Sequence, residues 1–421
     1  MEAEAEAGAP PPNLPLPPAF IDFLKDNGIN PSIYASASAS SLPRYIRLKP
    51  GTTTSETQIA EIESELGCEL ERVDWLPGFF AAPPHIHIAG SVSYKRGKIY
   101  GMDVASGAAV MALDVSPGDH VLDLCAAPGA KLCMLLDLLG SSGSLTGVDV
   151  ARHRLAACRT MLLKYGLGDR CRLFVADGTS FSLLPLREEV DTKTSNKSGW
   201  FFLKLPGATN IKECMDVLKE WSPKRSWKER KSARRSTNGT GPELVRAMAQ
   251  MELLYYGRHS GMVGHSKRDL FITRGDSEAS VSGYDRVLVD AECTHDGSFK
   301  HIQKFEHWGW DTLQRRVLYA ERSDSLTHLQ LNLLTNGFRL LNVGGSLVYS
   351  TCSLTVAQNE DVVKQFLSRN PAAELVEIEV AKNWPCRSGL IPKTLRFDPL
   401  TSQTSGLFIA KITKISQTLE V

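Results

Sequence analysis

Two cysteines of the sequence are candidate nucleophiles. Cys293 lies in the segment DAECTHD, directly after a predicted strand, and Cys352 lies in STCS at the end of another predicted strand. A cysteine usually fills a hydrophobic core, but one just beyond the carboxyl end of a strand in an open α/β sheet faces the ligand crevice and can be a nucleophile. A cysteine protease is the competing interpretation, because His295 lies close to Cys293. It leaves the ligand-binding signals upstream without a role.

The segment Asp123–Lys131 (DLCAAPGAK) predicts a strand that runs into a small-residue turn and then a helix. Small residues let a ligand approach the backbone, and a helix N-terminus offers free N–H groups to a carboxylate or other anion. The segment is neither G-x-G-x-x-G nor a Walker loop, which disfavours dinucleotide and triphosphate ligands. A tight turn that binds no ligand is the alternative.

Two acidic residues follow at the ends of the next strands. Asp149 closes TGVDV, where a carboxylate can accept hydrogen bonds from ribose hydroxyls, and Asp177 closes FVADG, where the amino group of an adenine could be bound. Either residue alone is more often a turn or N-cap residue. Together with the upstream turn they form three ligand-type positions at consecutive strand ends, which favours one shared site.

The elements that must position these residues alternate from His120 onward. Strands are predicted at HVLDLCA, SLTGVDV, CRLFVADG, DRVLVDA and GGSLVYSTC, with helices over Ala130–Leu139, residues 151–166 and Asp324–Phe338. This alternation predicts an α/β fold with a doubly wound, mainly parallel sheet.

The rest of the chain divides around that sheet. We expect a disordered, acidic and proline-rich tail over residues 1–18 and a small α/β module over 19–95, built from helices at 19–27 and 56–66 and strands at 44–49 and 70–75. A third domain would cover 96–421, interrupted by a basic, partly disordered insertion at about 187–280. Its basic run Lys224–Arg235, with Trp221 and Trp227 nearby, is either a solvated surface or an RNA contact.

Composition narrows the class of protein. The 421 residues carry a formal net charge of +1, with 42% hydrophobic and 23% charged residues, as in ordinary globular proteins. The nine cysteines include no Cys-x-x-Cys pair, which predicts free thiols and no metal site. No apolar run approaches the length of a membrane span, and the acidic N-terminus resembles neither a secretory signal nor a transit peptide. We expect a protein of the nucleus or cytoplasm.

Three segments in this order, DLCAAPGAK, DRVLVDAECT and LVYSTCSLTVAQNE, resemble the Sun-type RNA cytosine-5 methyltransferases, which are class I enzymes dependent on S-adenosylmethionine. The similarity extends upstream to YGMDVAS at 100–106 and downstream to RFDP at 396–399 and TSGLFIA at 404–410. The similarity covers residues 95–186 and 281–415. No single motif among these would be enough to indicate the family; the ordered combination does.

The resemblance implies a Rossmann-like methyltransferase domain preceded by an RNA-binding module. It implies methylation of cytosine carbon 5 in RNA, with tRNA preferred over rRNA, by a monomer without a metal or a membrane. Cys352 would be the nucleophile at carbon 6, and Cys293 would assist product release. Asp290 would bind and protonate the cytosine edge, which stabilises the charge that develops at N3. The S-adenosylmethionine site would comprise Cys125, Ala126, Ala127, Pro128, Gly129, Ala130, Lys131, Asp149, Arg154, Asp177 and Asp290.

Departures from the family pattern keep other functions open. Glu292 replaces the usual proline before Cys293, and a carboxylate there should raise the pKa of that thiol. Ala130 replaces a glycine, which is tolerable if residue 130 is already helical, and the long insertion is atypical. The alternatives are an rRNA methyltransferase, a non-catalytic RNA-binding protein that keeps the fold, or a methyltransferase acting on DNA, protein or a small molecule.

Overall fold

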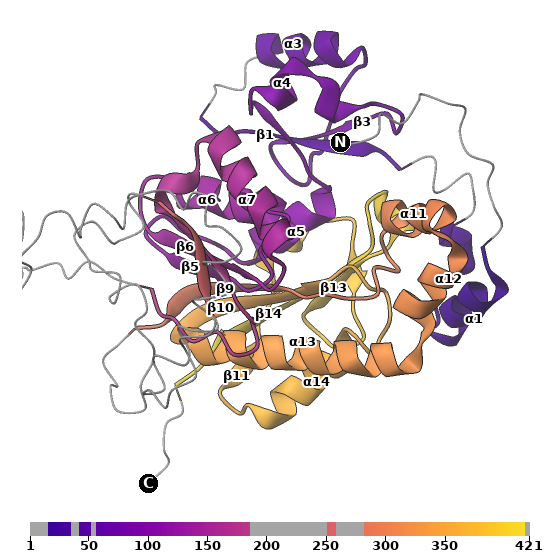
Figure 1. The fold of residues 1–421 in the computed structure, drawn as a ribbon, viewed down its shortest axis with the longest axis vertical. Coiled ribbons are helices and arrows are strands. Elements are labelled where there is room, and N and C mark those ends of the chain that lie inside the picture. The colour runs from indigo at the N-terminus through magenta and orange to yellow at the C-terminus, as the bar shows by residue number, and fades with distance from the viewer. Residues whose placement is uncertain (1–15, 35–41, 52–55, 186–250, 258–281, 417–421) are drawn as a thin grey trace, which may run out of the picture.

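The computed structural model describes residues 16–34, 42–51, 56–185, 251–257 and 282–416. These residues form two β-sheets with helices around them (Figure 1). The elements are, in chain order, α1 (Pro18–Asp26), η1 (Pro31–Tyr34), β1 (Arg44–Leu48), α3 (Glu56–Leu66), β2 (Glu71–Arg72), β3 (Phe79–Ala82), η2 (Ile88–Gly90), α4 (Val92–Lys95), β4 (Ile99–Gly101), α5 (Val104–Ala112), β5 (His120–Asp123), α6 (Ala130–Leu139), β6 (Ser144–Asp149), α7 (Arg152–Tyr165), η3 (Gly168–Arg170), β7 (Cys171–Val175), β8 (Glu252–Tyr256), β9 (Tyr284–Asp290), α11 (Phe299–Trp308), α12 (Trp310–Leu313), η5 (Gln314–Leu318), α13 (Ala320–Leu340), β10 (Leu341–Thr351), α14 (Glu360–Arg369), β11 (Ala373–Leu375), η6 (Glu379–Ala381), β12 (Arg387–Ser388), β13 (Thr394–Phe397), α15 (Pro399–Ser402) and β14 (Leu407–Lys414).

The larger sheet has ten strands in the order β12-β13-β14-β10-β9-β5-β6-β7-β8, with β11 paired to β14. Its centre, β10-β9-β5-β6-β7, is parallel throughout. This confirms the predicted α/β fold with a doubly wound sheet. The flanks differ from the prediction, because β14, β13 and β8 add antiparallel strands at the two sides.

Helices cover both faces of this sheet, with α13 and α14 on one side and α5, α6 and α7 on the other (Figure 1). Alternate residues of one strand serve the two layers. Leu288 joins the core of α5–α7, whereas Val287 and Val289 join the core of α13 and α14. Parallel strands buried on both faces need nearly continuous apolar runs, which is the pattern that DRVLVDA carries.

The helices predicted at 56–66 and 130–139 coincide with α3 and α6. The helix predicted over Asp324–Phe338 is part of the longer α13, and the strand predicted over residues 70–75 is reduced to β2.

The smaller sheet has the order β2-β3-β1-β4 and packs against α3. Its core includes Ile46, Ile62 and Phe80. Arg47 of β1 joins it to the larger domain through a buried ion pair with Asp137 of α6, at an N–O distance of 2.6 Å. Three of its strands lie within residues 19–95, where a small α/β module is expected, and β4 lies beyond residue 95.

The first two helical segments pack elsewhere. Phe20 and Leu24 of α1 lie in one apolar cluster with Phe299 and Phe305 of α11, and the hydroxyl of Tyr34 donates a hydrogen bond to the carbonyl of Asp296. The helix expected at 19–27 therefore exists but belongs to the flank of the larger domain.

Several expectations fall outside the described residues: most of the tail at 1–18, the run Lys224–Arg235, Trp221 and Trp227. Within the partly disordered insertion expected at about 187–280, β8 pairs with β7 as an edge strand of the main sheet. Hydrophobic Leu253 and Tyr256 pack against the core there. Among the described helices, none has the length and apolarity needed to cross a membrane.

Candidate active site

The two candidate cysteines lie side by side, since β9 and β10 are parallel neighbours and each cysteine follows the carboxyl end of its strand. The Sγ atoms of Cys293 and Cys352 are 3.4 Å apart. The Nδ1 atom of His295 lies 3.0 Å from the Cys352 Sγ and 3.6 Å from the Cys293 Sγ. Two thiols and one imidazole thus form a compact cluster at the edge where parallel sheets bind ligands.

Hydrogen bonds join the two cysteine-bearing loops to each other. The Gly297 amide donates to the Cys352 carbonyl (2.9 Å). The side-chain amide of Gln358 accepts from the Thr294 amide (3.1 Å) and donates to the Thr294 hydroxyl (2.9 Å). These contacts hold the thiols together independently of any ligand.

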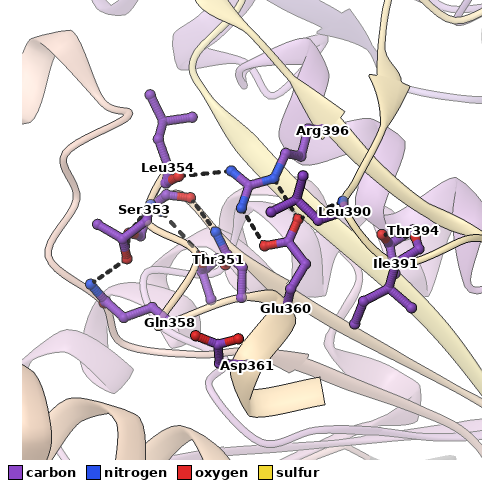
Figure 2. A network of polar contacts seen from close by, with 12 residues as sticks. Thr351, Ser353, Leu354, Gln358, Glu360, Asp361, Leu390, Ile391, Thr394 and Arg396 are labelled. Carbon is purple, nitrogen blue, oxygen red and sulfur yellow. Dashed lines mark hydrogen bonds and ion pairs between the residues drawn. The ribbon is translucent and has the colours of Figure 1, made fainter. Parts of the chain in front are cut away.

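The loop after Cys352 is fixed by a buried ion pair, shown in Figure 2. Arg396 of β13 forms a two-pronged ion pair with Glu360 at the start of α14 and donates to the Leu354 carbonyl at 2.7 Å. Asn359 adds a hydrogen bond to the Ser353 carbonyl (2.9 Å). The segments AQNE and RFDP, far apart in the sequence, therefore position the Cys352 loop.

The pKa values of the two thiols are shifted in opposite directions. Burial raises the pKa of the Cys293 thiol, but the hydrogen bond from Cys352 and the neighbouring imidazole of His295 outweigh it, so the Cys293 pKa lies well below its ordinary value. The pKa of Cys352 is raised well above its ordinary value, because its S–H is donated to Cys293 and because the side chain is buried. Cys293 is therefore the thiol of the pair whose ionisation is favoured.

The expectation that Glu292 raises the pKa of Cys293 stays a prediction, because that pKa is lowered overall by the contacts with Cys352 and His295. The Glu292 carboxylate acts on the imidazole: burial lowers the pKa of His295, but Cys293, Glu292 and Asp290 together raise it above its ordinary value.

Asp290 ends β9 and is paired with a lysine from the cofactor-type turn. Its Oδ2 lies 2.7 Å from Nζ of Lys131, and its Oδ1 accepts from the hydroxyl of Ser350 (2.7 Å). Burial lowers the pKa of Lys131, but Asp290 raises it overall, so the ammonium is retained. The Lys131 side chain thus connects the turn after β5 with the cysteine strands.

The turn from Cys125 to Ala130 is built from small residues. Gly129 has φ 111°, and a β-carbon there would lie 3.1 Å from the Cα of Cys158, so glycine is required. Ala130 is the first residue of α6, so the departure from glycine falls on a helical residue, as expected.

Asp149 closes this cradle from β6. Its Oδ2 accepts from the Ala127 amide (3.3 Å) and its Oδ1 from the Ala151 amide (2.8 Å). Arg154 of α7 donates to the Ala127 carbonyl (2.8 Å), which fastens the turn from the other side. Asp177 is exposed at the end of β7, where its Oδ1 accepts from the amide and hydroxyl of Thr179 (2.9 and 2.7 Å).

The residues singled out in the sequence thus gather at one sheet edge, beyond the carboxyl ends of β5, β6, β7, β9 and β10. The sequence interpretation missed the position of His295, which it considered only for a protease. The Cys-x-His spacing was the available signal, and a φ of 56° at His295 turns the loop there.

The central parallel strands are covered by helices on both faces. A small-residue turn follows the first of these strands, and an acidic residue follows each of the next two. This arrangement is that of a Rossmann-like methyltransferase fold. NSun6 from Pyrococcus horikoshii, in its crystal structure with SFG, has this fold: the TM-score is 0.59 at 15% identity, over 96% of this chain and 99% of that one.

The chain belongs to the family described as 16S rRNA methyltransferase RsmB/F, whose model matches residues 110–193 and 266–413. This confirms the Sun-type resemblance. The tRNA (cytosine(49)-C(5))-methyltransferase of Pyrococcus abyssi is 23% identical over 385 residues, 88% of this chain and 89% of that protein. The multisite-specific tRNA:(cytosine-C(5))-methyltransferase trm4b of Schizosaccharomyces pombe is 37% identical over 109 residues, which are 26% of this chain and only 14% of that relative.

Proposed function

We propose that this protein transfers a methyl group from S-adenosylmethionine to carbon 5 of cytosine in RNA through a covalent cysteine adduct, with tRNA as the favoured substrate. The observation that carries the proposal is the 3.4 Å contact between the Cys293 and Cys352 thiols beside the Asp290–Lys131 pair. A tRNA methyltransferase that matches most of this chain supports the choice of tRNA. The family description makes rRNA the second candidate.

The turn and its neighbours fit the proposed cofactor. The Gly129 position has no room for a side chain beside Cys158, and the amides of the first turn of α6 have no partners within the helix. Residues 126–131 would hold the methionine part, Asp149 the ribose, and Asp177 the adenine, with Arg154 keeping the turn in place. When bound, the cofactor supplies an electrophilic methyl group.

Cys352 is assigned the attack on carbon 6 of the cytosine, where its Sγ–C6 bond makes carbon 5 nucleophilic. The proton of Cys352 passes to Cys293, whose sulfur lies within hydrogen-bond distance and whose pKa is lowered. Asp290 accepts from the cytosine edge, and the Lys131 ammonium, 2.7 Å from that carboxylate, offsets negative charge that develops on the ring.

Release needs a base for the proton on the methylated carbon 5, after which the Sγ–C6 bond breaks and the Cys352 thiolate leaves. Cys293 is assigned this step once it has passed the proton taken from Cys352 to solvent, because its sulfur is in contact with that of Cys352. The target base must leave its stack to reach the sheet edge, which favours single-stranded or loop RNA. The small β2-β3-β1-β4 sheet is the part to which we assign further RNA contacts.

The decisive experiment incubates purified protein with methyl-labelled S-adenosylmethionine and size-fractionated cellular RNA. Cys352→Ala should abolish the 5-methylcytosine signal and leave cofactor binding intact. Cys386→Ala, which removes a half-buried cysteine from the β13 side of the domain, is the matched control and should keep the signal. Label confined to the tRNA fraction supports tRNA, and label confined to rRNA favours the second candidate.

Cofactor binding without label in any fraction would instead favour the non-catalytic RNA-binding alternative. Full turnover by Cys352→Ala would remove the nucleophile assignment.

A further inference from the structure

Cys293, His295 and Cys352 offer three soft donor atoms that converge on one point. The sulfurs are 3.4 Å apart, and the Nδ1 of His295 lies 3.0 and 3.6 Å from them. A tetrahedral Zn²⁺ ion, with Zn–S of about 2.3 Å and Zn–N of about 2.0–2.1 Å, needs sulfurs about 3.8 Å apart and each sulfur about 3.6 Å from the nitrogen. Shifts of a few tenths of an ångström meet these requirements.

The donors are held in place before any ion arrives. The Gly297 amide binds the Cys352 carbonyl, and Gln358 binds Thr294 from the opposite loop (2.9–3.1 Å). The Gly406 amide in turn donates to the Gly297 carbonyl (2.8 Å). Such bracing lowers the entropy lost when an ion fixes its ligands, which favours binding.

Charge around the cluster also favours a cation. Acidic residues lie beside the cluster, since Asp290 ends β9 and Glu292 and Asp296 belong to the loop that bears Cys293 and His295. Lys131 neutralises part of the Asp290 charge. The remaining negative field, together with two thiols that ionise on coordination, matches a soft divalent ion better than a hard one.

We propose that Cys293, His295 and Cys352 bind one thiophilic divalent cation of the Zn²⁺ class, with a fourth coordination position left open. The sulfurs bind as thiolates and His295 binds through Nδ1 of its neutral imidazole, so any proton that these three groups carry passes to solvent as the metal bonds form. Because a coordinated sulfur cannot attack a base, an occupied site blocks the methyl transfer, and removal of the metal restores it. This last consequence rests on the proposed function, whereas metal binding itself does not.

The test is a titration of the purified, metal-free full chain with Co²⁺ alone, followed by displacement with Zn²⁺. We expect one equivalent of Co²⁺ to give thiolate charge-transfer bands and the visible bands of a tetrahedral ion. Cys293→Ser, Cys352→Ser and His295→Asn should each weaken binding by about tenfold or more, since loss of a mere hydrogen-bond partner of a ligand costs 10–100-fold. Cys68→Ser, which changes a cysteine outside the cluster, should bind as the unaltered chain does.

Absence of the thiolate bands, or binding that survives all three substitutions, would overturn the proposal. Circular dichroism and cofactor binding by each variant separate loss of a ligand from loss of the fold. A second arm adds Zn²⁺ and then a chelator to the methylation assay. If no methylation is found under any condition, the proposed function fails while the Co²⁺ titration still decides the metal site.

Discussion

Replacing Arg396 by methionine should destabilise the protein and loosen the Cys352 loop together. The Glu360 side chain is 0% exposed and that of Arg396 is 8% exposed, and their pairing is two-pronged. With the arginine gone, the carboxylate keeps the Leu390 amide (3.1 Å) as a described partner. Removing one member of a buried ion pair costs about 3–5 kcal/mol because the other charge is left uncompensated.

A double-mutant cycle in urea or guanidinium chloride measures this effect. Arg396→Met alone should lower the free energy of unfolding by about 3–5 kcal/mol. Arg396→Met combined with Glu360→Gln should cost less than the sum of the single changes, by about 0.5–3 kcal/mol, because no unpaired charge remains. Glu379→Gln, in the fully exposed Lys382–Glu379 pair (2.8 Å), is the matched control and should leave the unfolding midpoint unchanged.

The pH dependence has a defined sign. Burial raises the pKa of Glu360, but Arg396 and the Leu390 amide lower it overall below 4.5. A carboxyl with a depressed folded-state pKa adds stability above its unfolded pKa and loses it as the pH falls through the folded value. The difference in the free energy of unfolding between the unaltered protein and Arg396→Met should therefore become smaller as the pH falls. A strictly additive cycle, or a gap that is constant from neutral pH to pH 3, would refute the argument.

Two further predictions concern the sheet edge. Burial and the Asp290 charge raise the pKa of Asp123 from 3.8 to about 7. Because the folded protein then binds this proton more tightly than the unfolded chain does, the free energy of unfolding should decrease as the pH rises from 4 to 7, by up to about 4 kcal/mol. Asp123→Asn should flatten this slope in unfolding curves at pH 5 and 7, and an unchanged slope would count against the assignment. Cys293→Ala should accumulate a covalent protein–RNA adduct, visible as a cofactor-dependent band resistant to denaturing electrophoresis; an active variant without any adduct would contradict its role in release.

Local sequence signals predicted the strands and helix whose ends form the candidate site. Helix α6 could be bounded in advance because Gly129 precedes it and Gly140 ends it, both at positive φ. The parallel strands were recognisable from apolar runs that only a doubly covered sheet requires. The positions of Asp149, Asp290 and the two cysteines then follow, because carboxyl ends of parallel strands share an edge.

What the sequence did not reveal depends on long-range pairing. The antiparallel strands β13 and β14 bring Arg396 under the Cys352 loop through residues with no periodic signature of their own. The effect of Glu292 on the His295 imidazole, whose pKa it raises, was not predicted, because the sequence does not show that the two side chains interact. The edge strand β8 could not be separated from the surrounding insertion by composition alone.

The packing of α1 and η1 changes how an N-terminal deletion must be interpreted. Tyr34 and Asp296 are 262 positions apart, yet they meet directly behind the loop that bears Cys293 and His295. A shortened chain that begins at β1 would retain both sheets while uncovering Phe299, Ile302 and Phe305 of α11. Its loss of activity would then report an unsupported catalytic loop, and would be no measure of how much RNA affinity the N-terminal region provides.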